Sequence, residues 1–390
     1  MHIGVIAPEF PPEIGGMQTY AYEFVRELVR RGHRVTVFTQ RHADGEASLP
    51  GAEIVPALKR RRVLDRHILR TRDIDIWHVM NAAYAWVTLE TSPVVISVHG
   101  NDFLRPYILV ARHDFQRVPG LWRSSRWIPA LEKTLGHWLT ERLVRRALPK
   151  ASHILANSRY TEQVLLEKYP ACRGITSAAL VGVSSEYLDF EPTRSAHGHS
   201  NLITVCRLAE PRKNVDLVLR ALARLKDRYR FSYIVVGDGP LRPGLEQLVS
   251  ELGLGDEVRF VGLVDNAAQR DLLAKSDLFV LTSSISSTSH EGFGIAYLEA
   301  NACGTPVLAA RLAGAVEAVE EGVTGFFVDQ PAPLSIAAAL EQFFRREVQF
   351  DPVACRTFAA RFNWAKVVDS ALQHYPCGHT TAPAPYGLEL

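Results

Sequence analysis

Short apolar runs alternate with amphipathic stretches along most of the chain. The runs are rich in Val and Ile and are continuous, which is typical of parallel strands buried on both faces. Because helical stretches separate the runs, the pattern predicts right-handed βαβ units and an α/β fold with doubly wound parallel sheets. The expected strands lie at residues 3–7, 35–39, 74–79, 94–98, 153–156 and 178–181, and then at residues 202–206, 233–236, 258–261, 278–281, 306–309 and 326–328.

The first helix has a clear apolar face. Ala21, Phe24, Val25 and Leu28 are spaced i, i+3, i+4 and i+7, so they lie on one side of the helix. Gly32 follows as the residue that can adopt the left-handed conformation and end it.

Two polar breaks divide the chain. The first lies near residues 191–201 and the second near residues 349–352. A length of 390 residues suits two domains. The expected units are an N-terminal domain at residues 1–190, a second domain at 191–350, a C-terminal helical segment at 351–375 that crosses back to the first domain, and a disordered Pro- and Thr-rich tail at 376–390.

Composition narrows the class of protein. The chain is 47% hydrophobic and 22% charged, as expected of a globular protein. Its five cysteines are scattered without a C-x-x-C pair, which predicts reduced thiols rather than a disulfide framework or a zinc site. The sequence shows no signal peptide, and no apolar run approaches the ~20 residues of a membrane span. A cytoplasmic protein, peripheral to the inner face of the membrane at most, is expected.

The formal net charge of +2 is unevenly distributed. Residues 1–190 hold 25 Lys and Arg against 19 Asp and Glu, whereas the remainder holds 19 against 23, so an anionic partner is expected at the first half. Residues 105–150 hold ten Lys and Arg against three acidic residues, with Trp122, Trp127 and Trp138 among them, and residues 59–62 are all basic. Two hypotheses stand: contact with an anionic membrane surface, or a solvated helix pair whose tryptophans are core. No nucleic-acid partner is expected, because no nucleic-acid-binding module is recognised.

Gly15 and Gly16 lie between the first strand and the first helix. Two adjacent glycines let the backbone approach a ligand closely, and the helix N-terminus presents N–H groups to a phosphate. The alternative is that the pair only forms a tight strand-to-helix turn, since it is not the G-x-G-x-x-G dinucleotide motif.

Two cations follow the first strand of the second domain. Arg207 ends that strand, where α/β sheets bind their ligands, and Lys213 lies six residues further on. Together they can clamp a diphosphate and stabilise it as a leaving group. The alternative is a solvated basic loop.

Two glutamates eight positions apart give the strongest signal. Glu291 lies in a Gly-rich loop, and Glu299 lies about two turns into the following helix, ~12 Å further along it. This separation suits one carboxylate on the hydroxyls of a sugar and the other on a ribose. The N–H groups of Phe293, Gly294 and Ile295 point to the same place and suit phosphates or the sugar.

The stretch EGFGIAYLEANACGTPVLAA resembles the Glu–seven residues–Glu motif of the family-four retaining glycosyltransferases, which have the GT-B fold of two Rossmann-like domains facing a cleft. The Gly-Gly loop, the Arg207–Lys213 pair and the segments VGDGP, FVG and EG…GF follow in the family's order, over most of residues 1–375. One departure is the segment at 179–185, ALVGVSS, where the family often has Pro-Asn-Gly-Val-Asp; contacts of that Asn and Asp are therefore not carried over.

The resemblance implies retaining transfer of a hexose from a UDP- or GDP-sugar to a hydroxyl of a glycan, lipid-linked or polysaccharide acceptor. It implies that Arg207 and Lys213 hold the diphosphate and that Glu299 bonds the ribose. Glu291 and the backbone of residues 293–295 would hold the donor sugar. The remaining donor positions are Gly15 and Gly16 at the phosphate, Val264 beside the base, and Asp265 as a partner for guanine.

The N-terminal domain of this family takes the acceptor, and the two domains close around the donor. His99 ends a strand that faces the cleft, and with Asn101 and Asp102 it is the expected acceptor site; the alternative for His99 is a structural hydrogen bond. The expected catalytic set is His99, Arg207, Lys213 and Glu291, acting by positioning and charge neutralisation, with no metal or other cofactor. The alternative functions are transfer to a small natural product, a GT-B sugar-nucleotide epimerase, and a non-catalytic sugar-nucleotide binder.

Overall fold

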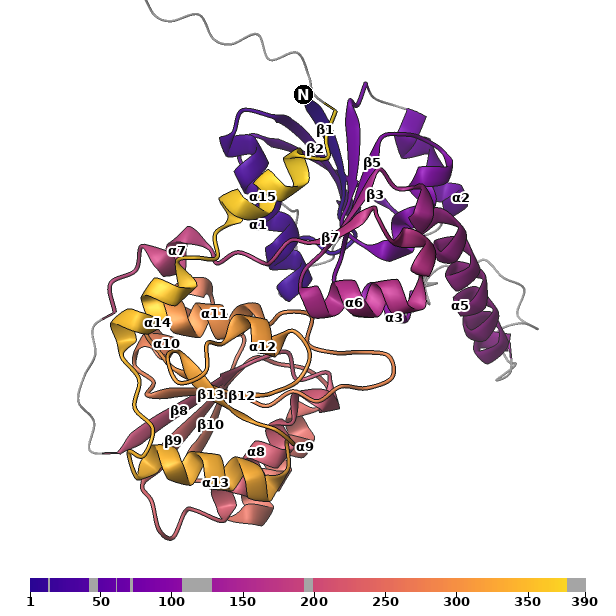
Figure 1. The fold of residues 1–390 in the computed structure, drawn as a ribbon. Coiled ribbons are helices and arrows are strands. Elements are labelled where there is room, and N and C mark those ends of the chain that lie inside the picture. Colours follow the sequence, from indigo (N-terminus) through magenta and orange to yellow (C-terminus); the bar gives the residue numbers. More distant parts are fainter. Residues whose placement is uncertain are drawn as a thin grey trace, which may run out of the picture.

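The structure is a computed structural model that describes residues 1–12, 15–41, 48–60, 62–70, 73–106, 128–192 and 199–376, with only the backbone at residues 63 and 128–137. It contains two parallel sheets with helices packed on their faces, one sheet in each half of the chain (Figure 1). The predicted α/β fold with two doubly wound, Rossmann-like units is thereby confirmed. Of the expected tail, residues 377–390 lie outside the described residues.

The first sheet has the order β3-β2-β1-β4-β5-β6-β7, and every neighbouring pair is parallel. The order reverses between β1 and β4, so the carboxyl ends of these central strands flank a topological switch point, where α/β sheets bind ligands. The strands are β1 (His2–Ile6), β2 (Arg34–Gln40), β3 (Ala52–Leu58), β4 (Ile76–Val79), β5 (Val94–Val98), β6 (His153–Ala156) and β7 (Thr176–Ala178).

The second sheet has the order β10-β9-β8-β11-β12-β13 and is also parallel throughout. Its switch point lies between β8 and β11. The strands are β8 (Ser200–Val205), β9 (Phe231–Val236), β10 (Val258–Gly262), β11 (Leu278–Leu281), β12 (Val307–Ala310) and β13 (Gly325–Val328).

The helices follow the strands in βαβ order. Ala21, Phe24, Val25 and Leu28 of α1 are at most 1% exposed, which confirms the apolar face predicted for this helix. The α-helices are α1 (Gly16–Arg30), α2 (Arg62–Asp65), α3 (Asn101–Leu104), α5 (Ile128–Ala147), α6 (Arg159–Lys168), α7 (Ser185–Leu188), α8 (Val215–Ala223), α9 (Arg242–Leu252), α10 (Asn266–Ala274), α11 (Ile295–Ala302), α12 (Ala315–Ala318), α13 (Pro333–Phe344), α14 (Pro352–Ala359) and α15 (Trp364–Leu372). The 3₁₀-helices are η1 (Arg66–Arg70), η2 (Ala82–Leu89), η4 (Leu148–Lys150), η5 (Pro170–Cys172) and η6 (Pro211–Lys213).

The last strand of the first sheet lies earlier than predicted. We expected it at residues 178–181, but β7 is Thr176–Ala178. The apolar residues beyond it leave the sheet, and Val181 and Val183 instead join the hydrophobic cluster between the two halves. Apolar character at these positions therefore reflects burial between domains and not strand pairing.

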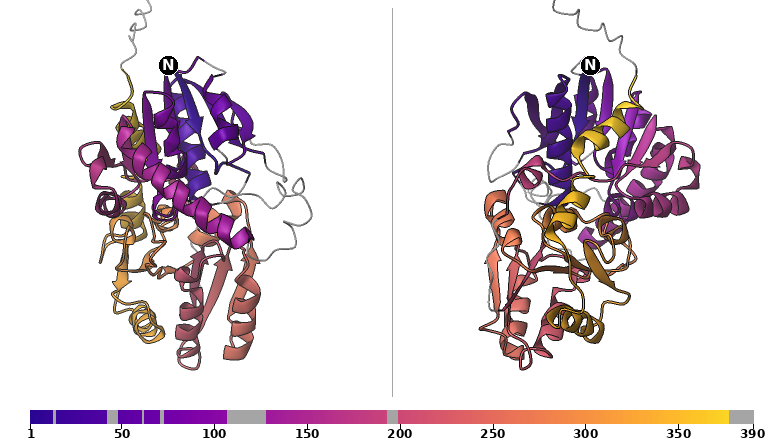
Figure 2. Two further views of the ribbon diagram at one scale, coloured as in Figure 1. Left: turned by 90° about the vertical axis from the view of Figure 1, so that its right-hand side faces the viewer. Right: turned by 60° about the vertical axis from the view of Figure 1, so that its left-hand side comes forward.

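The C-terminal segment passes from the second sheet to the first (Figure 2). The segment predicted as helical at 351–375 contains two helices, because Asn363 caps α15 by accepting the Lys366 N–H at 3.1 Å. At the break, Val183 N donates to Phe362 O at 3.0 Å. α15 then packs on α1, where Arg31 donates to Ala365 O at 2.8 Å.

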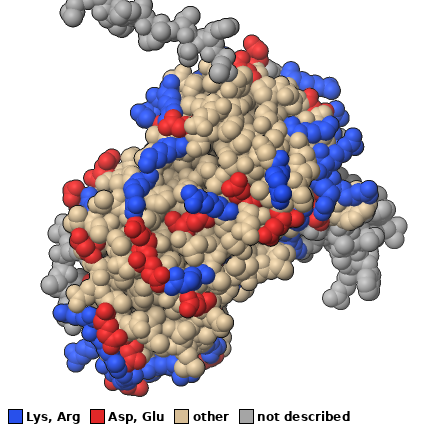
Figure 3. Space-filling view, in the orientation of Figure 1, with Lys and Arg blue, Asp and Glu red and all other residues tan. Residues whose placement is uncertain are grey.

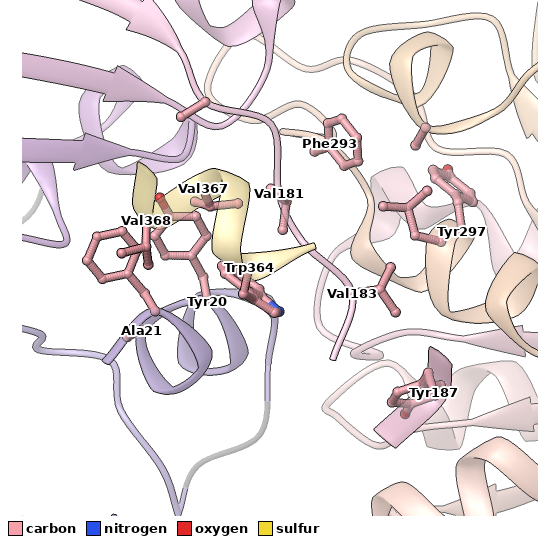
Figure 4. Packing of buried hydrophobic residues seen from close by; sticks show 14 of the residues in the cluster. Tyr20, Ala21, Val181, Val183, Tyr187, Phe293, Tyr297, Trp364, Val367 and Val368 are labelled. Carbon is pink, nitrogen blue, oxygen red and sulfur yellow. The ribbon is translucent and has the colours of Figure 1, made fainter. Parts of the chain in front are cut away.

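One hydrophobic cluster contains residues of both halves (Figure 4). Tyr20 of α1 and Trp364 of α15 meet edge to face at 5.3 Å between ring centroids. Phe293 and Tyr297, which flank the start of α11, belong to the same cluster and are at most 1% exposed. This packing fixes α1 and α11, the two helices that carry the Gly-Gly loop and the Glu–seven residues–Glu motif. Among the described residues, no helix combines the length and apolar character that crossing a bilayer requires.

Candidate functional site

The predicted site residues lie at the carboxyl ends of strands in both sheets. Gly15 and Gly16 follow β1, and His99 follows β5. Arg207 follows β8, and Glu291 lies in the loop between β11 and α11. The contacts described below join these four segments into one interdomain site.

The Gly-Gly loop lies directly against the second domain. A Cβ atom at Gly15 would overlap Nη2 of Arg207, and one at Gly16 would lie 3.9 Å from Cδ1 of Ile295. The absence of a side chain at Gly15 is therefore what leaves room for the Arg207 guanidinium. The structure thus places the predicted phosphate-binding backbone beside the predicted diphosphate-binding cation and the N-terminus of α11.

Glu291 is the centre of a buried ionic cluster. Its Oε2 lies 2.6 Å from Nζ of Lys213 and 3.4 Å from Nη1 of Arg212, and it accepts a hydrogen bond from Ser283 Oγ at 3.1 Å. Burial by itself would raise the pKa of this carboxyl, but Lys213 and Arg212 outweigh that effect and lower the pKa to about 2. Glu291 is thus a fixed anion, and its pairing with Lys213 was not predicted.

The loop that carries Lys213 is held by its neighbour Asn214. This residue has a left-handed backbone (φ 57°), and its side-chain amide donates to Thr282 O at 2.5 Å and to Ser284 Oγ at 2.7 Å. These bonds tie the loop after β8 to the loop after β11. The cations of the first loop and the glutamate of the second are therefore brought together by the strand order, since β8 and β11 are neighbours.

The start of α11 is shaped by Gly294. Its φ of 94° lies in the left-handed region, and a Cβ atom there would overlap the ring of Tyr297. Tyr297 is in turn fixed by donating its hydroxyl hydrogen to Leu281 O at 2.9 Å. The helix N-terminus, with the backbone of Phe293 and Ile295 beside it, is thereby held next to the Gly-Gly loop.

Glu299 lies in a different environment from Glu291. It accepts a hydrogen bond from Nε2 of Gln269 at 2.9 Å, and the same nitrogen donates to the Tyr187 hydroxyl at 2.8 Å. Burial raises the pKa of Glu299 to about 7, and the nearby Glu23 carboxylate adds to the rise. Hydroxyl groups of a diol that donate hydrogen bonds to this carboxylate would stabilise its ionised form.

The two residues predicted to lie beside the base are at the start of α10. Val264 is partly buried against the interdomain cluster. Asp265 is exposed and caps the helix by accepting the Ala268 N–H at 2.8 Å. One carboxylate oxygen of Asp265 is therefore already used to cap α10.

His99 is held by Asp102, by the ring of Tyr20 and by a hydrogen bond with the Met80 backbone. Asp102 accepts the His99 N–H and the Ala82 N–H, both at 2.9 Å, and is 2% exposed. The structure therefore gives Asp102 a supporting place behind His99 and not a place on the surface of the cleft. Burial lowers the pKa of the His99 imidazole, against the raising effects of Asp102 and of a hydrogen bond with the Met80 backbone.

The neutral His99 ring lies with its centroid 4.5 Å from that of Tyr20, edge to face. Among the described residues, no hydrogen-bond partner reaches His99 Nε2, and the same holds for Oδ1 of Asn101. These two atoms are the polar groups of the predicted acceptor segment that a ligand hydroxyl can satisfy, because a buried polar atom without a partner is costly.

The loop before α11 also contacts the first domain. A Cβ atom at Gly292 would lie 2.6 Å from Nδ2 of Asn157 and 2.7 Å from His99 O, and one at Gly100 would lie 2.7 Å from Nε2 of His290. The segment at residues 290–292 therefore touches the His99 loop directly.

Several site residues were missed at the sequence level. Arg212 could have been found from the sequence, because it stands next to Lys213 in the basic segment at residues 211–214. Gln269, Asn157 and His290 had none, because each acquires its role only when distant segments pack together.

Two family models match the chain. The model for glycosyl transferases group 1 matches residues 189–354, and the model for Glycosyltransferase Family 4 matches residues 14–176. Between them they contain all of the predicted site residues.

Curated relatives and solved structures match nearly the full length. A D-inositol 3-phosphate glycosyltransferase of Mycolicibacterium gilvum is 27% identical over 96% of this chain and 87% of its own. A GDP-mannose-dependent alpha-(1-6)-phosphatidylinositol monomannoside mannosyltransferase of Mycolicibacterium smegmatis is 27% identical over 83% of this chain and 84% of its own. Among structures, Anabaena HepE in complex with UDP-glucose has a TM-score of 0.69 at 18% identity (96% and 99% covered), and sucrose-phosphate synthase of Thermosynechococcus elongatus has 0.70 at 19% (96% and 98% covered).

Proposed function

Because the chain belongs to glycosyltransferase family 4 and has the GT-B fold, we propose that it transfers a hexose from a nucleoside diphosphate sugar to an acceptor hydroxyl, with retention of configuration. The acceptor class that we propose is a glycan, a lipid-linked sugar or a polysaccharide intermediate. The observation that carries the proposal is the contact between Gly15 and Arg207, which joins a phosphate-binding helix N-terminus to a cation across the cleft.

The donor diphosphate fits between these two groups. The N–H groups at the start of α1 and the cations Arg207 and Lys213 supply positive potential from both domains. Charge that develops on the departing diphosphate is neutralised by these cations, and we propose that no metal ion is required. Glu299 accepts hydrogen bonds from the ribose, and Val264 lies beside the base.

The donor sugar lies between Glu291 and His99. Glu291 is an ionised acceptor for sugar hydroxyls, held in place by Lys213 at 2.6 Å. His99 presents Nε2, which has no hydrogen-bond partner among the described residues, from the opposite side, and Gly292 brings the two segments into contact. The acceptor proton passes to the departing diphosphate, so catalysis rests on positioning and charge stabilisation and not on a conventional general base.

The names of the similar proteins support a UDP- or GDP-sugar as donor. One relative is GDP-mannose-dependent, and HepE has been solved with UDP-glucose. The four proposed donor contacts at Gly16, Arg207, Lys213 and Glu299 address phosphate and ribose, which both nucleotides share. These contacts therefore favour a nucleoside diphosphate sugar as the donor, but they do not distinguish uracil from guanine as its base.

Product analysis tests the proposed reaction. The protein is incubated with UDP-glucose or GDP-mannose, with sugar and lipid-linked acceptors, with and without EDTA. We expect release of one nucleoside diphosphate, a product whose anomeric proton shows the configuration of the donor, and no loss of activity in EDTA. An inverted product would overturn retention, and inactivation by EDTA that a divalent metal ion reverses would overturn the metal-independent mechanism.

We also propose that the N-terminal domain contacts an anionic membrane surface through α5. Trp138 and Leu139 are 49% and 52% exposed, and the Arg142 guanidinium lies 4.6 Å from the Trp138 ring centroid. This exposure disfavours the hypothesis that Trp138 is core, while Trp122 and Trp127 lie outside the described residues. Figure 3 shows Lys and Arg side chains gathered on the side of this domain where α2 and α5 lie in Figure 1.

Liposome flotation tests this contact. We expect salt-sensitive flotation with phosphatidylglycerol vesicles and none with phosphatidylcholine vesicles, and weaker flotation for Trp138→Ser. Equal flotation with phosphatidylglycerol and phosphatidylcholine vesicles would contradict the proposal.

A further inference from the structure

Two polar side chains lie in the core of the first sheet, on strands whose other residues are apolar. His78 of β4 and Ser97 of β5 are both fully buried, and Nε2 of His78 lies 2.8 Å from Oγ of Ser97. Neither residue belongs to the proposed donor site. A buried polar atom is costly unless it has a hydrogen-bond partner. The second ring nitrogen of His78 therefore needs a partner as well.

Further partners reach these two side chains from outside the sheet. The hydroxyl of Tyr20, on α1, lies 3.2 Å from Ser97 Oγ, and the hydroxyl of Tyr375, which follows α15, is hydrogen-bonded to Nδ1 of His78. Tyr20 is 1% exposed and Tyr375 is 5% exposed. A continuous series of buried hydrogen bonds therefore runs from Tyr375 through His78 and Ser97 to Tyr20. We call these four residues the Tyr375–Tyr20 network.

The protonation state of His78 gives this network a common direction. Burial lowers the pKa of His78 to about 3, so the ring is neutral and carries one N–H group. One ring nitrogen donates a hydrogen bond and the other accepts one, and the Ser97 hydroxyl continues the same direction to Tyr20. Removing the Tyr375 hydroxyl would leave one nitrogen of His78 without its partner and would loosen the groups beyond it.

Tyr20 is the member of the network that contacts the proposed site. Its ring meets the His99 ring edge to face, with 4.5 Å between the centroids. It also lies about one helical turn after Gly16, on the helix whose N-terminus we place at the donor phosphates. Trp364 of α15 packs on the same tyrosine ring at 5.3 Å (Figure 4). Tyr20 therefore contacts both His99 and the C-terminal segment.

The orientation of the His99 imidazole depends on this ring contact. Asp102 binds the backbone N–H of His99. The ring itself has a hydrogen bond with the Met80 backbone and its contact with Tyr20. A hydrogen bond fixes one atom of the ring, and the packed Tyr20 ring fixes its plane. Together they set the direction of Nε2, which has no hydrogen-bond partner among the described residues.

We propose that Tyr20 and Tyr375 are positioning residues for His99: the Tyr375–Tyr20 network holds Tyr20 in place, and the Tyr20 ring fixes the direction of His99 Nε2 at the point of sugar transfer. The inference rests on the proposed function, in which His99 contacts the sugar and the acceptor. Neither tyrosine needs to touch the substrate. The C-terminal segment thereby supports the reaction as well as joining the two domains, because both Tyr375 and Trp364 act on Tyr20.

Steady-state kinetics with matched tyrosine variants test the inference. The full-length protein is assayed with UDP-glucose or GDP-mannose under the conditions of the product analysis, and melting temperatures are recorded. Tyr375→Phe and Tyr20→Phe each remove one hydroxyl and keep the ring, whereas Tyr20→Leu also removes the ring. The control is Tyr233→Phe, because Tyr233 is fully buried and its hydroxyl lies 2.6 Å from Thr204 Oγ1 in the other domain.

We expect kcat to fall about threefold in Tyr375→Phe and Tyr20→Phe and at least about tenfold in Tyr20→Leu, because small displacements of a positioned group slow the reaction. The KM for the donor should stay within about twofold of its original value. Tyr233→Phe should leave kcat unchanged. When each variant is combined with His99→Gln, we expect no further fall of kcat, because the ring that the tyrosines position is absent.

The NMR signal of the His99 Cε1 proton gives a second readout that needs no turnover. The signal is identified by its loss in His99→Gln. Because the Tyr20 ring lies 4.5 Å from the imidazole, the chemical shift should change in Tyr20→Leu, should change less in Tyr375→Phe, and should stay constant in Tyr233→Phe. If Tyr20→Leu does not fold, the two Phe variants decide the outcome.

A fall in melting temperature with an unchanged kcat and an unchanged His99 signal would overturn the inference, because the network would then be purely structural. An equal fall of kcat in Tyr233→Phe, or the same fall in the presence of His99→Gln, would also overturn it. If the unmodified protein transfers no sugar, the proposed function fails. The NMR signal then still shows whether Tyr20 and Tyr375 set the His99 ring.

Discussion

The Arg207 guanidinium occupies the space that a side chain at Gly15 would fill. One residue follows the first strand of the first sheet and the other follows the first strand of the second sheet, so the contact spans the two domains. It places the Arg207 cation and the N-terminus of α1 side by side, so that both can contact the same ligand. The account of donor binding depends on this relationship.

Substituting Gly15 with Ala should displace Arg207 and leave the fold intact. The three atoms nearest to the added Cβ belong to the ends of two flexible side chains, Arg207 and Gln18, and the backbone of Gly15 is extended (φ 164°). Because one charge-assisted contact is worth about 1.5–3 kcal/mol, we expect nucleoside diphosphate affinity to fall by about tenfold or more with little change in melting temperature. Calorimetry on Gly15→Ala checks this, with Gly244→Ala in α9 as the control, since a Cβ there meets nothing within 4 Å. Unchanged affinity would show that nucleoside diphosphate binding does not depend on the position of Arg207 beside Gly15.

His99 should affect turnover more than donor binding. In the proposed complex its side chain contacts the sugar and the acceptor and not the diphosphate. We therefore expect His99→Gln to lower kcat by about tenfold or more while the KM for the donor changes little, the pattern of an interaction made in the transition state. Steady-state kinetics with His33→Gln as control measure this. A large rise in KM at constant kcat would instead place His99 in donor binding.

Glu299 should make the stability of the free protein depend on pH. Its pKa rises from 4.5 to about 7 on folding, so between these values the folded chain keeps a proton that the unfolded chain has lost. The free energy of unfolding should therefore fall as pH rises through this window, by at most on the order of 3 kcal/mol.

Urea unfolding between pH 4.5 and 8 tests this dependence. In Glu299→Gln, which has no proton to lose, the fall attributable to Glu299 should be absent. Curves that run parallel in both proteins would contradict the prediction.

How far the sequence predicts this fold depends on how local the signal is. The apolar face of α1 and most parallel strands were predicted because their patterns arise within a few residues. β3 was missed because it is an edge strand, where Glu53 and Pro56 are tolerated. The apolar residues at 180–181 misled the prediction because they are buried between domains.

The same distinction holds for the site. Gly15, Arg207 and Glu291 could be proposed from motifs, since each lies at a strand end with recognisable neighbours. The pairing of Lys213 with Glu291 and the bond from Gln269 to Glu299 join segments far apart in sequence. Such contacts exist only after the strand order is set, and no local pattern encodes them.

Gly182 should be essential for the crossing of the C-terminal segment. A Cβ atom there would lie 2.7 Å from Trp364 N and 2.9 Å from Asn363 C, and both are backbone atoms that cannot move aside cheaply. We expect Gly182→Ala to lower the free energy of unfolding by about 1–3 kcal/mol, the usual cost of overpacking. Denaturant unfolding measures this. The exposed Gly255→Ala, where a Cβ meets nothing within 4 Å, should change stability by less than about 0.5 kcal/mol; an equal loss in both variants would contradict the assignment.

The most direct test of the central claim is calorimetric titration of UDP, GDP, ADP and dTDP into the unmodified protein, Arg207→Ala and Glu299→Ala. The donor site described here predicts that at least one nucleotide binds, with one base preferred, and that affinity falls by at least about tenfold in both variants. Binding that is unchanged in both variants, or no binding of any of the four nucleotides, would contradict a donor site in this cleft.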